Sequence, residues 1–227
     1  MDDDSASQVT PAPFAIRDCA LITLATGIKA QNLREFLEGV RSIPHGSLDH
    51  HFWGRLLRPQ FDEPEYNNDF ASWVWRGLHD KPLAERLSMI SPSEFEDLEA
   101  LRQEVVEVIE ERLDESEMMH WAPADQQFDF LTAQIVVFDT GFSFADPSHL
   151  CLDLHQFSTG SIYYHFIDAR RRTPGRCDDF SAWLAGFDGS HSALRDRLSA
   201  IDPYFSSLKE IRQLIAEAFR AYCEERA

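Results

Sequence analysis

The sequence has few of the short motifs that identify a cofactor site or an enzyme. Its ten glycines form neither G-x-G-x-x-G nor G-x-x-x-x-G-K-[ST], which excludes the common phosphate-binding loops. Its four cysteines include no C-x-x-C pair, so we expect reduced thiols and neither a zinc site nor a disulfide framework. The cysteines are Cys19, Cys151, Cys177 and Cys223. We therefore expect no cofactor and no metal.

Positive charge and long apolar runs are also scarce. The chain has 21 Lys and Arg against 39 Asp and Glu, a formal net charge of -18. A surface this negative repels nucleic-acid backbones and anionic membranes. No apolar run approaches membrane-spanning length, and the start MDDDS lacks the basic residues of a signal peptide. We expect a soluble, cytoplasmic protein with neither a nucleic-acid nor a membrane partner.

Two parts of the chain resemble each other. At a shift of 114 positions, residues 14–54 lie on residues 128–168 without a gap and share seven identities. The identical pairs are Phe14 and Phe128, Thr26-Gly27 and Thr140-Gly141, Gly46-Ser47 and Gly160-Ser161, and His51-Phe52 and His165-Phe166. Arg58 meets Arg172 at the same shift, and short gaps extend the match to Asp69 and Asp179, Trp73 and Trp183, and Arg102-Gln103 and Arg212-Gln213. The pattern predicts an internal duplication.

The duplication divides the chain. We expect a loose acidic tail over residues 1–13, a first repeat over 14–113, a linker over 114–127 and a second repeat over 128–223, with one fused globular domain left open. Each repeat should contain one strand that stops at Thr-Gly, followed by four or five helices. The expected fold is α+β, mainly α, with two halves related by a pseudo-twofold axis and their lone strands paired with each other.

Helix signals within the repeats are specific in several places. IKAQNLREFLEGVRSI has an apolar stripe, and Asp146-Pro147 suits a helix start. Ser47 and Ser161 stand where N-caps are expected. Asp69 and Asp179 should lie in the first turn of the next helix.

Both halves resemble a bacterial family known as domain of unknown function 5752. The first half carries Thr26-Gly27-Ile28-Lys29-Ala30 with Asn32-Leu33, then Asn68-Asp69-Phe70 and Trp73; the second carries Ser161-Ile162-Tyr163-Tyr164-His165. The second half lacks the Lys-Ala-x-Asn-Leu run, and the first departs from the pattern at Leu48-Asp49-His50. The resemblance implies no activity, cofactor or catalytic residue.

The candidate binding residues are the His/Arg sets that recur in both halves. These are His51, Arg55 and Arg58 in the first half and His165 and Arg172 in the second. An Arg beside a His can bind phosphate or carboxylate, Arg by paired hydrogen bonds and His by a titratable donor. In the alternative structural interpretation, Asp69 and Asp179 pair with the arginines and the histidines are satisfied core donors.

Other polar clusters favour structural roles. Ser47 and Ser161 lie four residues before a His, as a nucleophile could, but no G-x-S-x-G elbow surrounds them. The group His45, Asp49, His50 and His51 contains metal-ligand types, yet adjacent helix residues point apart. The basic run Arg170-Arg171-Arg172 with Arg176 is flanked by Asp168, Asp178 and Asp179, which would neutralise it.

The sequence therefore predicts a noncatalytic binding or regulatory module that recognises an anionic small molecule or a protein partner. The alternative is a hydrolase-type enzyme with His51 or His165 as general base. A purely structural subunit is the third possibility.

Overall fold

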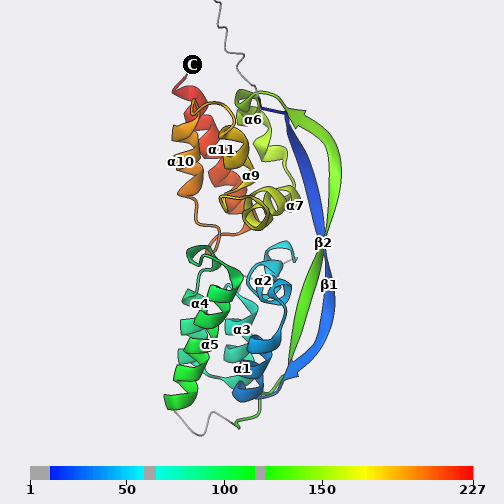
Figure 1. Cartoon of the computed structure of the whole chain (residues 1–227), viewed down its shortest axis with the longest axis vertical. Coiled ribbons are helices and arrows are strands. Elements are labelled where there is room, and N and C mark those ends of the chain that lie inside the picture. The colour runs from blue at the N-terminus through cyan, green and yellow to red at the C-terminus, as the bar shows by residue number, and fades with distance from the viewer. Residues whose placement is uncertain (1–10, 59–64, 116–120, 227) are drawn as a thin grey trace, which may run out of the picture. The chain divides into compact units, whose positions relative to one another are not determined.

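The computed structural model describes residues 11–58, 65–115 and 121–226. In these residues the chain is mainly helical with one two-stranded sheet (Figure 1). This confirms the predicted α+β, mainly helical class. Most of the predicted tail and part of the predicted linker, residues 1–10 and 116–120, lie outside the described residues.

The chain divides into two compact units that are not the two halves of the sequence. The central unit comprises residues 21–136, and the terminal unit comprises residues 1–20 together with 137–227. The boundaries fall inside the two strands, β1 (Phe14–Ala30) and β2 (Phe128–Phe144). Each strand therefore gives one half to each unit. The predicted repeats, 14–113 and 128–223, are statements about sequence likeness and stay predictions.

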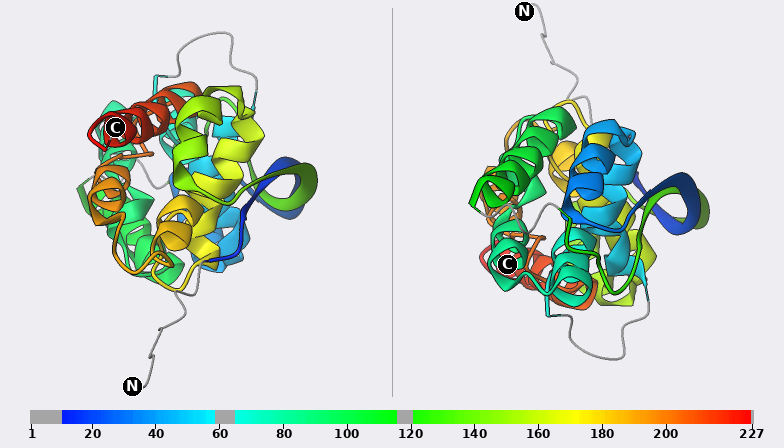
Figure 2. Two further views of the ribbon diagram at one scale, coloured as in Figure 1. Left: turned by 90° about the horizontal axis from the view of Figure 1, so that it is seen from above. Right: turned by 90° about the horizontal axis from the view of Figure 1, so that it is seen from below.

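The two strands pair with each other, as expected. Thr26 Oγ1 donates to the carbonyl of Phe130 at 2.7 Å, and Thr140 Oγ1 donates to the carbonyl of Ile16 at 2.7 Å. Because later residues of one strand bond earlier residues of the other, the strands are antiparallel. Within each unit the strands lie to one side of the helices (Figure 1 and Figure 2).

The prediction that both strands stop at Thr-Gly is wrong. Gly27 and Gly141 have φ values of 84° and 76°, a conformation open to glycine and typical of β-bulges. The backbone bends there and the strands continue to Ala30 and Phe144. The helix expected from Ile28 consequently begins at Leu33, with Asn32 as its N-cap, whose Oδ1 accepts from the Glu35 N–H at 2.9 Å.

The helices of the central unit pack around buried phenylalanine side chains. Its α-helices are α1 (Leu33–Ser42), α2 (His45–Trp53), α3 (Asp69–Leu78), α4 (Lys81–Met89) and α5 (Leu98–Glu115). Phe36 of α1 and Phe70 of α3 are fully buried, with ring centroids 5.4 Å apart. Phe128 of β2 lies 5.3 Å from Phe36 and 5.8 Å from Phe70. The start of β2 is thus part of this core.

The terminal unit has shorter and less regular helices. They are α6 (Pro147–Asp153), α7 (Thr159–Ile162), a π-helical segment (Tyr163–Asp168), α8 (Ala169–Arg172), α9 (Asp179–Leu184), α10 (Ser192–Ser199) and α11 (Leu208–Glu224). Asp146 caps α6 through the Ser148 N–H, as predicted, with Pro147 at the first helical position. Phe14 of β1 stacks on Phe180 of α9 with centroids 5.0 Å apart.

The expectation that the four cysteines are reduced thiols is wrong for two of them. Cys151 of α6 and Cys223 of α11 form a disulfide across 72 residues, with Cα atoms 6.7 Å apart. This pairing could not be predicted from the sequence, because Cys151 and Cys223 are brought together only when α11 packs against α6 in the folded unit. Cys19 and Cys177 are free thiols. Among the described residues, no helix is long and apolar enough to cross a membrane.

Candidate binding site

His51 is a buried link between α2 and the start of β2. Its Nε2 accepts the backbone N–H of Leu131 at 3.0 Å, across 80 residues of sequence. Its Nδ1 lies 3.1 Å from Asp69 Oδ2, at the start of α3. Because Nε2 is an acceptor, the ring proton is on Nδ1 and is donated to Asp69. Both ring nitrogens are therefore engaged.

His165 makes the same contacts in the terminal unit. Its Nε2 accepts the backbone N–H of Arg17 at 2.9 Å, and its Nδ1 lies 2.8 Å from Asp179 Oδ2. The ring is 2% exposed. A general base needs a free nitrogen lone pair facing its substrate. Neither histidine has one.

Asp69 carries the charge that balances the first His/Arg set. Burial opposes its ionisation, but the hydrogen bond from His51 and the charges of Arg58 and Arg55 outweigh burial and lower its pKa. Arg58 Nη1 lies 3.6 Å from Asp69 Oδ2, and its Nη2 donates to His50 Nε2 at 2.9 Å. Arg55 donates to Ser72 Oγ at 2.9 Å and to the carbonyl of Tyr66. The first set therefore has internal partners.

Arg172 is engaged more completely. Its Nη2 lies 2.9 Å from Asp179 Oδ2, and its Nε donates to Asp168 Oδ2 at 2.8 Å. The guanidinium carbon lies 4.0 Å from the centroid of the Tyr164 ring. Arg171 also donates to Asp168. The carboxylates that flank the basic run in the sequence thus neutralise at least two of its arginines.

The predicted N-caps are wrong. α2 begins at His45, with Pro44 as N-cap, so Ser47 is the third helical residue and donates its hydroxyl to the carbonyl of Leu131 at 2.6 Å. α7 begins at Thr159, and Ser158 is its cap, with Oγ accepting the Ser161 N–H at 2.9 Å. Both helices begin three residues, nearly one turn, earlier than expected. The expectation that Asp69 and Asp179 lie in first turns is confirmed.

The metal-like group on α2 is dispersed in space. His45 pairs with Glu99 of α5 at 3.1 Å, and His50 turns towards Arg58. Burial, followed by the neighbouring charges of His51 and Arg58, lowers the pKa of His50 to about 4. Among the described residues, no three His, Cys, Asp or Glu side chains are grouped so as to hold a metal ion.

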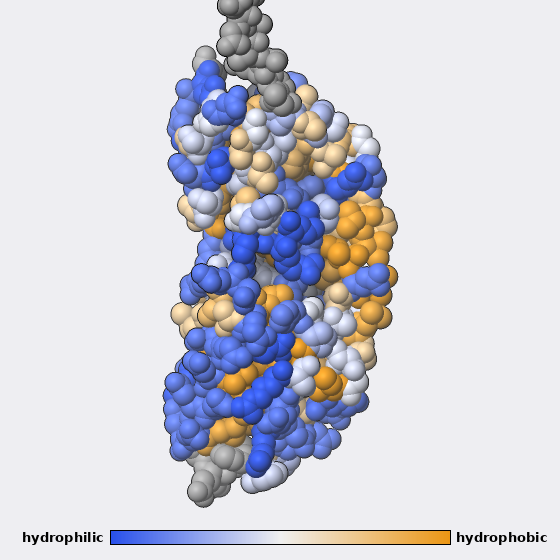
Figure 3. All heavy atoms as spheres, in the orientation of Figure 1, coloured by the Kyte–Doolittle hydropathy of each residue, from blue (hydrophilic) through white to orange (hydrophobic). Residues whose placement is uncertain are grey.

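Sequence reasoning missed an apolar surface on the strands. In the central unit β1 exposes Ile22 and Leu24 to 50% and 47%. In the terminal unit β2 exposes Val137, Phe138 and Phe142, the last to 70%. Figure 3 shows hydrophobic colouring along the strands. The signal was present, because Leu21-Ile22 and Ile135-Val136-Val137-Phe138 place apolar residues at successive positions, whereas helices cover only one face of each strand.

Comparisons with known proteins agree with the resemblance. Among solved structures, the chain is similar to OrfY from Thermoproteus tenax, with 28% identity, a TM-score of 0.79, and coverage of 92% of this chain and 95% of that one. A comparison with curated proteins gives no match. The model of the Family of unknown function (DUF5752) matches residues 11–220, and this chain therefore belongs to that family.

Proposed function

We propose that the protein is a noncatalytic binding module that docks a protein partner on the exposed apolar side chains of β2 in the terminal unit. The observation that carries the proposal is the exposure of Val137, Phe138 and Phe142 on β2. Apolar side chains gathered on a surface and not covered by the chain itself are typical of interaction sites.

The pairing of the strands supports this choice. β2 lies at an edge of the two-stranded sheet, and backbone groups along its outer side can bond an added segment. The N–H and carbonyl of Leu131 already bond His51 and Ser47, so the proposal concerns the later part of β2, in the terminal unit. A partner segment can therefore contribute both main-chain bonds and apolar contacts.

An anionic small molecule was the other class of partner predicted from the sequence. It would need donors that are not already used. Arg58 and Arg172 both face carboxylates, Asp69 and Asp179, and each histidine accepts a backbone N–H. An anion would have to displace these internal carboxylates, which favours the protein partner.

The hydrolase alternative gains no support from this geometry. Protonation of His51 at Nε2 would require loss of its bond from Leu131, and His165 has the same constraint at Arg17. We retain the noncatalytic assignment in the proposal. Because the net charge is -18, we do not include nucleic acids among the proposed partners.

Two further expectations belong to the proposal. An origin by internal duplication is supported by matching contacts 114 positions apart: Leu131 and Arg17 meet equivalent histidines, and Phe130 and Ile16 meet equivalent threonines. A cytoplasmic location is supported by the free thiols of Cys19 and Cys177, while the Cys151–Cys223 disulfide is less common there.

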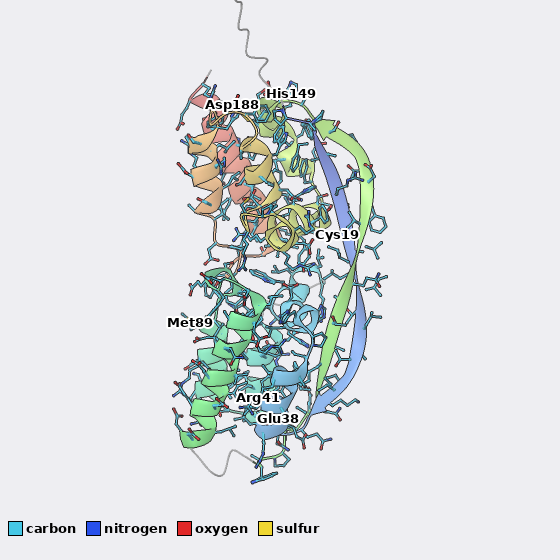
Figure 4. The ribbon with its side chains drawn as sticks, viewed as in Figure 1. Cys19, Glu38, Arg41, Met89, His149 and Asp188 are labelled. Atoms are coloured by element: carbon cyan, nitrogen blue, oxygen red, sulfur yellow. A yellow bond between two sulfur atoms is a disulfide. The ribbon has the colours of Figure 1, made fainter. Side chains whose placement is uncertain are left out.

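Co-purification with matched variants tests the proposal. Phe138→Asp with Phe142→Asp places charge on the exposed apolar residues of β2, and Met89→Asp with Phe205→Asp places it on exposed apolar residues elsewhere. Met89 lies on the side of α4 away from the strands (Figure 4). We expect the strand variant to lose, by about tenfold or more, a protein that wild type and control retain. Equal retention by both variants would reject the proposal.

The anion class is tested separately. Thermal-shift screening of sugar phosphates, nucleotides and organic acids should give no stabilisation of wild type. A stabilising compound whose effect disappears in Arg58→Ala or Arg172→Ala would replace the protein partner with a small anion.

A further inference from the structure

The hydrophobic core of the helices in the central unit includes residues of a strand that follows these helices in the sequence. These helices end at Glu115, whereas Phe128 and Phe130 belong to the strand that precedes the second set of helices. Phe130 is fully buried, and Phe128 is 6% exposed. Phe128 lies 5.3 Å from the Trp73 ring and 4.9 Å from the His51 ring. The start of β2 is therefore core to the first set of helices.

The hydrophobic core of the helices in the terminal unit likewise includes residues of a strand from elsewhere in the sequence. They begin at Pro147, but their core includes Phe14 from the start of β1. The Phe14 ring lies 5.3 Å from Trp183 and 4.9 Å from His165. Ile16, two residues further along β1, is 3% exposed.

Hydrogen bonds between helix side chains and the strand backbone set the same position of the strand in both units. Trp73 Nε1 donates to the carbonyl of Gln126 at 2.6 Å, and Trp183 Nε1 donates to the carbonyl of Ala12 at 2.9 Å. Each bonded carbonyl lies two residues before the buried phenylalanine. The histidine-bound N–H, of Leu131 or Arg17, lies three residues after it. Each set of helices thus binds an extended segment by its backbone and by its aromatic side chain.

Small residues permit this close approach. A Cβ on Gly160 would collide with the Asp18 carboxylate and lie 2.6 Å from the Cys19 carbonyl oxygen. A Cβ on Gly46, in the central unit, would lie 3.2 Å from Thr132 Oγ1. Gly46 lies on α2, which also carries His51, and Gly160 lies on α7, which is followed directly by the π-helical segment that carries His165.

We infer that the two halves of the chain exchange strands: each set of helices is a receptor for the extended segment that begins the other half. The segment is recognised by a buried phenylalanine, a carbonyl two residues before it and an N–H three residues after it. Neither 14–113 nor 128–223 then contains a complete core. The segment that fits each receptor is the matching segment of the other half of the same chain.

Hydrogen exchange on the full chain tests the exchange of strands. Phe14→Ala should speed amide exchange in α9 and α11 by about 100-fold or more, and should leave α1 and α3 near wild type. Phe128→Ala should do the reverse. Phe142→Ala, at an exposed position of β2, is the control and should change neither set. Faster exchange in α1 and α3 after Phe14→Ala, with α9 unchanged, would overturn the inference.

Cleavage of the folded chain gives a second test if the alanine variants unfold as a whole. A protease site placed within residues 116–120 should be cut without separating the halves, which should co-elute as one species in gel filtration. Two folded halves that elute separately would show that each contains its own core and would overturn the inference. In the same experiment, Trp73→Phe should weaken the association of the cut halves, because it removes the bond to Gln126.

Discussion

His51 accepts the backbone N–H of Leu131, 80 residues away, at 3.0 Å. The bond joins the second helix of the chain to its second strand, and His165 joins the π-helical segment to the first strand at Arg17. Arg and His in a repeated pattern suggested a ligand site. The folded chain uses the histidines to hold its own strands.

Replacing His51 should therefore reduce stability. His51→Ala removes the side-chain acceptor of the Leu131 N–H and the closer of the two partners of the Asp69 carboxylate, and we expect a loss of about 2–4 kcal/mol in the free energy of unfolding. His165→Ala should have a similar effect. His45→Ala is the control, because its pair with Glu99 is exposed, and it should change stability by less than about 0.5 kcal/mol. Urea denaturation measures all three, and equal effects at 45 and 51 would contradict this role.

The free energy of unfolding should change with pH because of the protonation of His50. Its pKa is lowered from 6.5 to about 4 in the folded chain, so the unfolded chain binds more protons between these values. The contribution of His50 to the free energy of unfolding is therefore fully present above about pH 6.5. It falls by on the order of 3 kcal/mol as the pH drops towards 4. His50→Gln keeps an acceptor for Arg58 and should flatten the curve in that window. Asp69, whose pKa is lowered, should lose its contribution only at lower pH.

That interpretation of His50 fails if wild type and His50→Gln have parallel stability curves from pH 7 to pH 4. Urea denaturation at half-unit pH steps gives the comparison.

The two free thiols should differ in reactivity. Burial, followed by the charges of Asp18 and Asp168, raises the pKa of Cys19 to about 12. Its thiol also donates to the Gly160 carbonyl at 3.3 Å. Cys177 is partly exposed. Iodoacetamide at pH 8 should label Cys177 at least about 100-fold faster than Cys19, read by peptide mass spectrometry. Comparable rates in the native protein would contradict the buried position of Cys19, and denatured protein, in which both label, is the control.

The disulfide should stabilise the terminal unit alone. Closing a loop of 72 residues restricts the unfolded chain, and reduction should cost about 2–4 kcal/mol. Dithiothreitol should lower the melting temperature of wild type and speed exchange in α6 and α11. The Cys151→Ser, Cys223→Ser double variant should melt at the reduced temperature and not respond to dithiothreitol, whereas Cys177→Ser should behave as wild type. No effect of dithiothreitol on wild type would argue against a stabilising bond.

Local patterns in the sequence predicted much of the helical part. Asp69, Asp179 and Asp146-Pro147 start helices where short-range capping chemistry says they should. Ser47 misled because its hydroxyl is used by the Leu131 carbonyl, a partner far along the chain. The lengths of the strands were underestimated because Thr-Gly usually ends a strand, while Gly27 and Gly141 here bend one.

The candidate site was predicted only in part. The sequence indicated that His51 and Arg58 share a neighbourhood with Asp69, and the alternative structural interpretation described their contacts. It did not indicate which strand each histidine would meet, because that depends on the exchange between halves. The sequence did not predict the exposure of Leu24 and Phe138, since their burial depends on what covers the outer face of a strand.

Photo-crosslinking from the strands is the most direct test of the proposed function. A photoreactive residue replaces Phe138 in one variant and Phe205 in another, both exposed and both in the terminal unit. After irradiation in cells of the source organism, we predict that position 138 links to one specific protein, that Phe142→Asp reduces this product, and that position 205 does not form it. No product at 138, or the same products at 138 and 205, would contradict a docking surface on the strands.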